Sequence, residues 1–251
     1  MTGTTPPRAN IVWLDDLDST AALADRLMAS WIEKEEDPLP DTLLVAATQR
    51  EGRGRGENSW SSPPGGLYAN WLAWVPTGEL GLVPMAVGVT LAEAVEGLWP
   101  AASVGLKWPN DLIAGGGKLG GVLCRSRGSG ESIWVSVGFG VNLSAEPAAG
   151  AGSLRALGWS GDASAGARTL AVAFLENVHA ALHDAAGTRR RWVARSVHRR
   201  GDEIRLRLEG GVVAGRFVGF DPDGRLELEV GGETRRFSAG EVMMGERSGG
   251  A

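Results

Sequence analysis

The chain has 251 residues, enough for one large hydrophobic core or for a main domain with a small second one. Its formal net charge of -5 argues against general nucleic-acid binding, while 43% hydrophobic and 22% charged residues are typical of a soluble globular protein. The single cysteine, Cys124, excludes an internal disulfide and a cysteine-based metal cage, and the absence of a signal peptide or an apolar stretch of about 18 residues favours a cytoplasmic location without membrane contact.

The N-terminal region predicts a strand followed by a helix. Residues 11–14 are a short apolar run, and apolar side chains then recur at helical spacing over residues 23–31. Asp18, Ser19 or Thr20 is the expected N-cap, because short polar side chains satisfy the free N–H groups of a first turn. Two interpretations remain open for these residues: capping alone, or capping together with contact to a polar ligand group.

A loop lies between the next two predicted strands. Residues 33–41 are acidic and proline-rich and predict a connection, whereas residues 42–47 and 67–74 predict buried strands. Residues 49–60 therefore link strand to strand. Apolar periodicity then predicts a long helix over residues 79–98.

The middle of the chain predicts more strands and then two helices. Strands are expected at residues 104–108, 112–114, 118–125 and 132–141, and helices at 167–186 and 189–197. The small residues at 145–152 predict a linker.

Turn signals at short, regular spacing begin at Gly201 and predict a small antiparallel barrel. We therefore expect a main domain of residues 1–199 and a barrel domain of residues 200–251, with a frayed tail from Gly245.

The loop sequence QREGRGRGENSW contains the clearest candidate for ligand binding. Gly52, Gly54 and Gly56 alternate with Arg53 and Arg55. Alternating glycine permits close approach of the backbone to a ligand, and arginine can grip phosphate or carboxylate with two donors. A solvated surface loop is the alternative interpretation, since glycine and charge runs often form one. The loop matches neither a P-loop nor a dinucleotide fingerprint, so it predicts another kind of anion site.

Two lysines stand in apolar surroundings further along the chain. Lys107 lies inside the predicted strand 104–108, and Lys118 begins another predicted strand. A buried ammonium is costly without a partner, so both lysines are candidates for binding an anion. The alternative for each is a side chain that reaches solvent from a strand end.

Three motifs in this order, GRGRG with a following tryptophan, KWPNDL and GGKLGGVL, resemble the biotin–protein ligase family. The resemblance runs from about residue 14 to residue 142, and the small barrel is consistent with it. It implies an α+β fold, in which a mixed β-sheet of the class II synthetase-like biotin–lipoate ligase type is backed by helices and joined to a C-terminal SH3-like β-barrel. Members of the family use ATP and Mg²⁺ to convert biotin to biotinyl-5′-AMP. They transfer biotin to a lysine of a biotin carboxyl carrier domain, as in acetyl-CoA carboxylase.

The resemblance also assigns roles to individual residues. It places biotin against Ser19, Thr20, Gln49, Arg53, Gly54, Arg55, Lys118, Gly120 and Gly121. It places the nucleotide against Arg53, Arg55, Trp60, Lys107, Asn110, Asp111, Lys118 and Asn142. Catalytic roles fall to Lys118, Arg53 and Arg55, and no side chain is assigned as a metal ligand.

One departure from the family pattern concerns Gly56 and Glu57, where many relatives have a basic residue and a glycine. A carboxylate there should weaken anion capture unless it faces solvent. The region before Asp15 is too short for a helix-turn-helix domain, so we expect no DNA binding. Cys124 is expected to be a core residue, and Trp108 either lines the biotin ring or is buried.

Two other functions remain open: a lipoate or octanoate ligase of the same fold, and a non-catalytic sensor of biotin or nucleotide. Edge strands of the sheet could pair with a second copy, giving a homodimer, or with the carrier domain.

Overall fold

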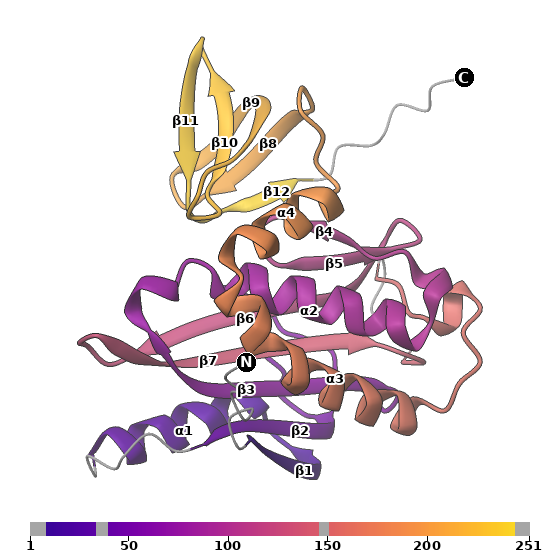
Figure 1. Cartoon of the computed structure of the whole chain (residues 1–251). Coiled ribbons are helices and arrows are strands. Elements are labelled where there is room, and N and C mark those ends of the chain that lie inside the picture. Colours follow the sequence, from indigo (N-terminus) through magenta and orange to yellow (C-terminus); the bar gives the residue numbers. More distant parts are fainter. Residues whose placement is uncertain (1–8, 34–39, 146–150, 244–251) are drawn as a thin grey trace, which may run out of the picture.

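The computed structural model describes residues 9–33, 40–145 and 151–243 and contains two β-sheets (Figure 1). The larger sheet has seven strands in the order β1-β2-β3-β7-β6-β5-β4. Its strands are β1 (Ala9–Leu17), β2 (Asp41–Gln49), β3 (Gly66–Pro76), β4 (Gly105–Lys107), β5 (Asp111–Ala114), β6 (Gly117–Arg127) and β7 (Ser132–Asn142). The β1–β2 pair is parallel and the other pairs are antiparallel, so the sheet is mixed as predicted.

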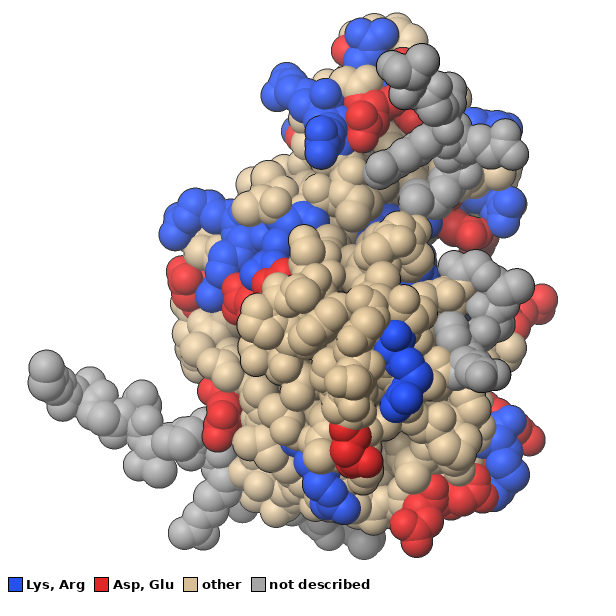
Figure 2. Space-filling model, turned by 90° about the vertical axis from the view of Figure 1, so that its right-hand side faces the viewer, with Lys and Arg blue, Asp and Glu red and all other residues tan. Residues whose placement is uncertain are grey.

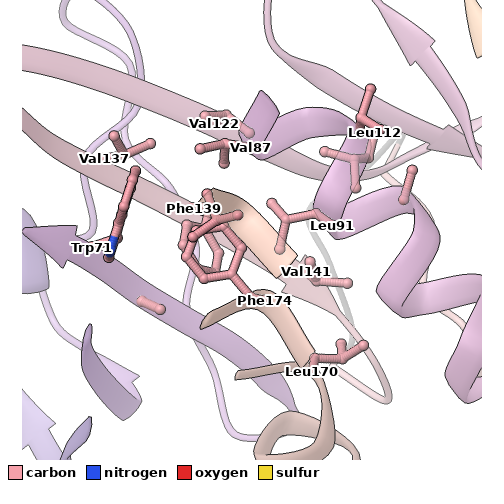
Figure 3. Close-up of a cluster of buried hydrophobic side chains, with 14 of the residues drawn as sticks. Trp71, Val87, Leu91, Leu112, Val122, Val137, Phe139, Val141, Leu170 and Phe174 are labelled. Carbon is pink, nitrogen blue, oxygen red and sulfur yellow. The ribbon is translucent and has the colours of Figure 1, made fainter. Parts of the chain in front are cut away.

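Three helices cover one face of this sheet: α2 (Val83–Leu98), α3 (Ala163–His183) and α4 (Ala185–Arg195). Alternation along the strands explains the choice of face, because successive side chains point to opposite sides. On β7, the odd-numbered residues from Val135 to Val141 are apolar and pack under the helices. Figure 3 shows the centre of this core, where Trp71 and Phe139 of the sheet lie around Phe174 of α3.

The opposite face of the sheet is covered by α1 (Thr20–Glu33) at one end only. Ala24 and Met28 of α1 pack there on Leu44, Leu72 and Trp134. Further along β7 the same face carries glycine in place of bulky side chains, which leaves room for a cavity between α1 and the edge formed by β4 and β5.

The second sheet is antiparallel, with five strands in the order β11-β10-β9-β8-β12. Its strands are β8 (Glu203–Leu208), β9 (Gly211–Phe220), β10 (Leu226–Val230), β11 (Glu233–Phe237) and β12 (Glu241–Met243). It lies beyond β4 and α4 (Figure 1) and fits an SH3-like domain. Trp108, which follows β4, is 4% exposed and packs in the core of this second sheet with Leu206, Phe217 and Leu228. Its indole Nε1 donates to the Gly224 carbonyl oxygen at 3.0 Å.

Several predicted boundaries were wrong. The helix predicted from residue 79 begins at Val83, after a short 3-10 helix at Thr77–Glu79. The helix predicted over 167–186 begins at Ala163, because Asp162 caps it by accepting from the Ala165 N–H at 2.7 Å. The helix predicted from 189 begins at Ala185, because the Asp184 side chain caps it by accepting from the Gly187 N–H.

Parts of the predicted connections at 33–41 and 145–152, and the predicted frayed tail, lie outside the described residues.

Within the described ranges, no helix combines the length and hydropathy needed to cross a membrane. On the face seen in Figure 2, basic and acidic side chains lie near one another at the borders of a broad uncharged area.

Candidate active site

A cavity of about 420 Å³ opens on the face of the main sheet that α1 leaves uncovered. A volume of this size suits a small organic ligand. Twelve residues predicted from the sequence line it: Ser19, Thr20, Gln49, Arg53, Gly54, Arg55, Trp60, Lys107, Asn110, Asp111, Lys118 and Gly121. They come from the start of α1, the loop after β2, and the strands β4, β5 and β6, so the fold brings four separated stretches of sequence together.

The start of α1 forms a polar wall of the cavity. The Thr20 N–H and hydroxyl both donate to Oε1 of Gln49, at 2.8 and 3.0 Å, and Nε2 of Gln49 donates to Ser62 at 2.8 Å. Ser19 is 2% exposed, and its hydroxyl has no hydrogen-bond partner among the described residues. Because a buried unpaired hydroxyl is costly, the Ser19 Oγ is suited to meet a polar ligand group.

The arginine-glycine loop is folded back on itself as a small hairpin. The Gly54 N–H donates to the Asn58 carbonyl and the Trp60 N–H to the Gly52 carbonyl, both at 2.8 Å. A Cβ at Gly52 would lie 2.2 Å from the Trp60 carbonyl oxygen, so this hairpin requires glycine at that position. The loop is therefore held by backbone hydrogen bonds and lines the cavity, although most of its residues are exposed.

The two predicted arginines have partners on different elements. Arg53 pairs with Asp25 of α1, with 3.5 Å between Nη1 and Oδ2. Arg55 donates from Nη1 to the carbonyl of Gly240, which directly precedes β12, at 2.8 Å, so the loop contacts the second domain as well. Glu57 is exposed and does not line the cavity, which meets the condition under which its carboxylate leaves anion capture intact.

Lys118 lies at the floor of the cavity beside an aromatic ring. Its Nζ is 2.7 Å from Oδ1 of Asp111 and 5.3 Å from the ring centroid of Trp60. The Trp60 ring rests on Gly121 and Gly140, which are paired residues on β6 and β7. A Cβ at Gly140 would lie 2.6 to 2.8 Å from the indole atoms, so glycine is needed for the ring to lie there.

Two predicted site residues do not line the cavity. Gly120 does not line the cavity, and a Cβ on it would lie 2.6 Å from the Gly140 carbonyl oxygen, so glycine is needed there for close packing of β6 against β7. Asn142 is 3% exposed and donates to the Gly152 carbonyl at 3.0 Å, so its amide supports a loop behind the site. Asn110 does line the cavity, but its amide also donates to the Val122 carbonyl at 2.7 Å.

Sequence reasoning missed several residues of the lining, among them Asn58, Ser59, Gly138, Gly140 and Glu241. Glycine inside an apolar strand is a signal of close approach, and it could have identified the two glycines of β7. No local signal marks Glu241, which comes from the second sheet.

Two titratable groups outside the cavity lining, His198 and Cys124, have shifted pKa values. Burial and, to a smaller extent, the positive charge of Lys107 lower the pKa of His198 to about 4 against the opposing charge of Asp202, so this imidazole is neutral at pH 7. Burial raises the pKa of the Cys124 thiol to about 12. Cys124 packs against the main core, as predicted, and is not a nucleophile at neutral pH.

Two family models match separate parts of the chain. Residues 27–142 match the biotin/lipoate A/B protein ligase family, and residues 201–245 match the biotin protein ligase C-terminal domain. A biotin--[acetyl-CoA-carboxylase] ligase from Paracoccus denitrificans is 33% identical over 217 residues, which cover 80% of this chain and 90% of that protein. The enzyme of the same name from Mycobacterium tuberculosis is 33% identical over 216 residues, or 80% of this chain and 78% of that protein.

The chain belongs to the biotin–protein ligase family. A solved biotin protein ligase from Aquifex aeolicus, in complex with biotin and ATP, superimposes on this chain with a TM-score of 0.71 at 26% identity. The superposition covers 93% of this chain and 97% of that one. The predicted fold class is confirmed by this match. Both parts of the family architecture are therefore present in this ligase, with the cavity next to the boundary between them.

Proposed function

We propose that this ligase activates biotin with ATP and transfers it to a lysine of a biotin carboxyl carrier protein of the acetyl-CoA carboxylase type. The observation that carries the proposal is the convergence of Arg53, Arg55, Lys107 and Lys118 on one cavity that the polar groups of Ser19 and Gln49 also line. A cavity with both cations and uncharged hydrogen-bonding groups suits a ligand with a neutral polar ring and an anionic end.

The first step joins two anions. A carboxylate oxygen of biotin attacks the α-phosphorus of ATP, the bond from that phosphorus to the bridging oxygen breaks, and pyrophosphate leaves. Two unit charges about 4 Å apart repel by about 1 kcal/mol in water and by about 4 kcal/mol at a protein surface. The cationic groups of Lys118, Arg53 and Arg55 would offset this repulsion and stabilise the charge on the phosphorus oxygens in the transition state.

The proposed positions of the substrates follow the chemistry of the walls. The ureido ring of biotin would meet the Ser19 hydroxyl, beside Gln49, because ureido groups both donate and accept hydrogen bonds. The adenylate would lie near Trp60, Lys107 and Asp111, with Lys118 between the biotin carboxylate and the α-phosphate. Gly120 and Asn142, which do not line the cavity, would act on the site through backbone packing.

The second step consumes the mixed anhydride. The neutral amine of the carrier lysine attacks the acyl carbon, an amide forms, and AMP leaves with the electron pair of the broken acyl–oxygen bond. Water would destroy the same intermediate, and the hairpin of residues 52–60 over the cavity would exclude it. The step needs no nucleophile from the enzyme.

Mg²⁺ would accompany ATP. Within the described residues no three His, Cys, Asp or Glu side chains gather as a metal site, and the carboxylates that line the cavity are Asp111 and Glu241. This donor set suits Mg²⁺, which is usually held by one or two carboxylates together with substrate phosphates. The ion would neutralise part of the phosphate charge.

A homodimer is part of the proposal, with β1 as the pairing edge. Within the described residues β1 pairs only with β2, and Val12 and Trp13 are each 40% exposed on it. An edge strand with exposed apolar side chains is suited to pair with a second copy or with the carrier. Size-exclusion chromatography coupled to light scattering should give twice the chain mass for the wild type. A Val12→Lys variant should give the monomer mass.

Pyrophosphate release tests the enzymatic proposal. The protein mixed with ATP, Mg²⁺ and biotin should release pyrophosphate, and Lys118→Ala should lose that activity by about a hundredfold or more while keeping its melting temperature. A non-catalytic sensor would release none. A faster rate with lipoate or octanoate than with biotin would instead favour the lipoate ligase function.

Transfer is tested separately with a purified carrier domain. Mass spectrometry should find one added biotin on one lysine of the carrier. A carrier variant with arginine at that lysine should stay unmodified, and pyrophosphate release without any transfer would contradict the proposed second step.

A further inference from the structure

Arg53 belongs to a three-residue ion cluster that no motif predicts. Asp25 of α1 lies between two arginines, with its Oδ2 at 3.5 Å from Nη1 of Arg53 and at 2.8 Å from Nη1 of Arg125. Arg125 comes from β6, and Arg53 comes from the hairpin over the cavity. Only Arg53 of the three lines the cavity. The cluster therefore joins the hairpin to α1 and to the main sheet beside the site.

We propose that Asp25 and Arg125 are positioning residues that hold the Arg53 guanidinium at the cavity for the phosphate groups of ATP. The inference rests on the proposed function, since it adds two residues to the same first step. Neither Asp25 nor Arg125 lines the cavity, so both would act on the substrate through Arg53.

Local backbone structure explains why Arg53 needs such a support. Gly52 and Gly54 flank it, and glycine leaves the backbone more freedom than any other residue. A long arginine side chain between two glycines would lose much conformational entropy when it binds a phosphate. The ion pair with Asp25 fixes the guanidinium before the ligand arrives, so less entropy is lost on binding.

The charges of the cluster leave Arg53 attractive to an anion. Asp25 alone would neutralise Arg53 and compete with phosphate for it. Arg125 lies closer to the shared oxygen than Arg53 does, so it takes up most of the carboxylate charge. The three residues together carry one net positive charge, and Arg53, the member at the cavity, presents it.

If the cluster only stabilised the fold, the loss of Asp25 would lower the melting temperature. The side chains of Arg53, Asp25 and Arg125 are 47%, 36% and 35% exposed, and ion pairs with this exposure add little to stability. The loss of Asp25 should then leave the melting temperature nearly unchanged. Its effect should instead be found in the interaction with ATP.

A double-mutant cycle with Asp25→Asn and Arg53→Ala, measured by steady-state pyrophosphate release and by calorimetric titration with ATP, tests this inference. Asp25→Asn should raise the KM for ATP about threefold to tenfold, with a smaller change in kcat and in the KM for biotin. In the Arg53→Ala background, Asp25→Asn should have no further effect, because the residue that it positions is gone. Asp25→Glu should recover part of the lost ATP affinity.

Asp16→Asn is the matched control, since Asp16 pairs with Arg50 of the same loop but does not line the cavity. It should leave all constants at wild-type values. An equal KM for ATP in wild type and Asp25→Asn would overturn the inference. It would also be overturned if Asp25→Asn raised the KM for ATP equally with and without the Arg53 side chain. If wild type binds ATP but releases no pyrophosphate with biotin, the proposed function fails, and the calorimetric cycle still decides this inference. Absence of ATP binding by wild type would overturn both.

Discussion

Trp108 offers the sharpest test of how the second sheet supports the active site. The residue stands in the KWPND motif of the main domain, yet its ring is buried in the core of the second sheet and its Nε1 donates to Gly224. Replacing a buried tryptophan with alanine costs about 3–5 kcal/mol. Trp108→Phe keeps most of the ring and leaves the Gly224 carbonyl without its donor, which costs about 1–3 kcal/mol.

The loss of stability in the Trp108 variants should affect the second sheet first, before the whole chain unfolds. Arg55 bonds to Gly240, and Glu241 lines the cavity, so a loosened second sheet should also slow pyrophosphate release. Hydrogen exchange read by mass spectrometry should show faster exchange in residues 203–243 for Trp108→Ala, with β2 and β3 unchanged. Trp108→Phe should show a smaller effect in the same direction.

Trp74→Phe is the matched control, because Trp74 is 36% exposed on the main sheet. It should leave both exchange and activity unchanged. Wild-type exchange over residues 203–243 in Trp108→Ala would refute the anchoring role. Faster exchange there with an unchanged rate of pyrophosphate release would refute the link between the second sheet and the site.

Three further predictions concern single residues. Gly140→Ala should displace the Trp60 ring from the cavity floor and lower kcat/KM for ATP about tenfold, visible also as a change in tryptophan emission, because the new Cβ would lie within 2.8 Å of that ring. His198 is neutral when folded and takes up a proton on unfolding, so stability should fall as the pH drops from about 6.5 to about 4; His198→Leu should reduce that loss by up to about 3 kcal/mol in denaturant titrations, and an unchanged pH profile would show that another group is responsible. Cys124 should stay unmodified by a thiol reagent at pH 8 until the protein is unfolded, since its thiol pKa is near 12, and rapid labelling of the native protein would contradict its assignment to the core.

Much of the fold could be predicted because strands and helices carry local periodicities. The alternation of β7 and the apolar run of β2 mark buried strands whatever they pack against. The starts of α2, α3 and α4 were all missed. At α3 and α4 the caps Asp162 and Asp184 precede small residues with weak periodicity, and there the cap, and not the apolar pattern, decides where the helix begins.

Of the residues predicted for the site, Arg53, Lys118 and Gly121 line the cavity. Gly120 and Asn142 do not, because a motif does not say which of its residues face a cavity. Neighbouring residues of a strand point to opposite faces, so adjacent members of one motif can have different roles.

The order of elements, the cation-rich stretches and the separation into a large and a small unit were determined by the sequence itself, because each depends on residues close together along the chain. Three features were decided only by the tertiary structure: the Trp108 ring in the second sheet, the Arg55 contact with Gly240 and the Asp25 contact with Arg53. These contacts join residues that are far apart in sequence. Chain folding alone brings such residues together, so no local pattern of side chains records them.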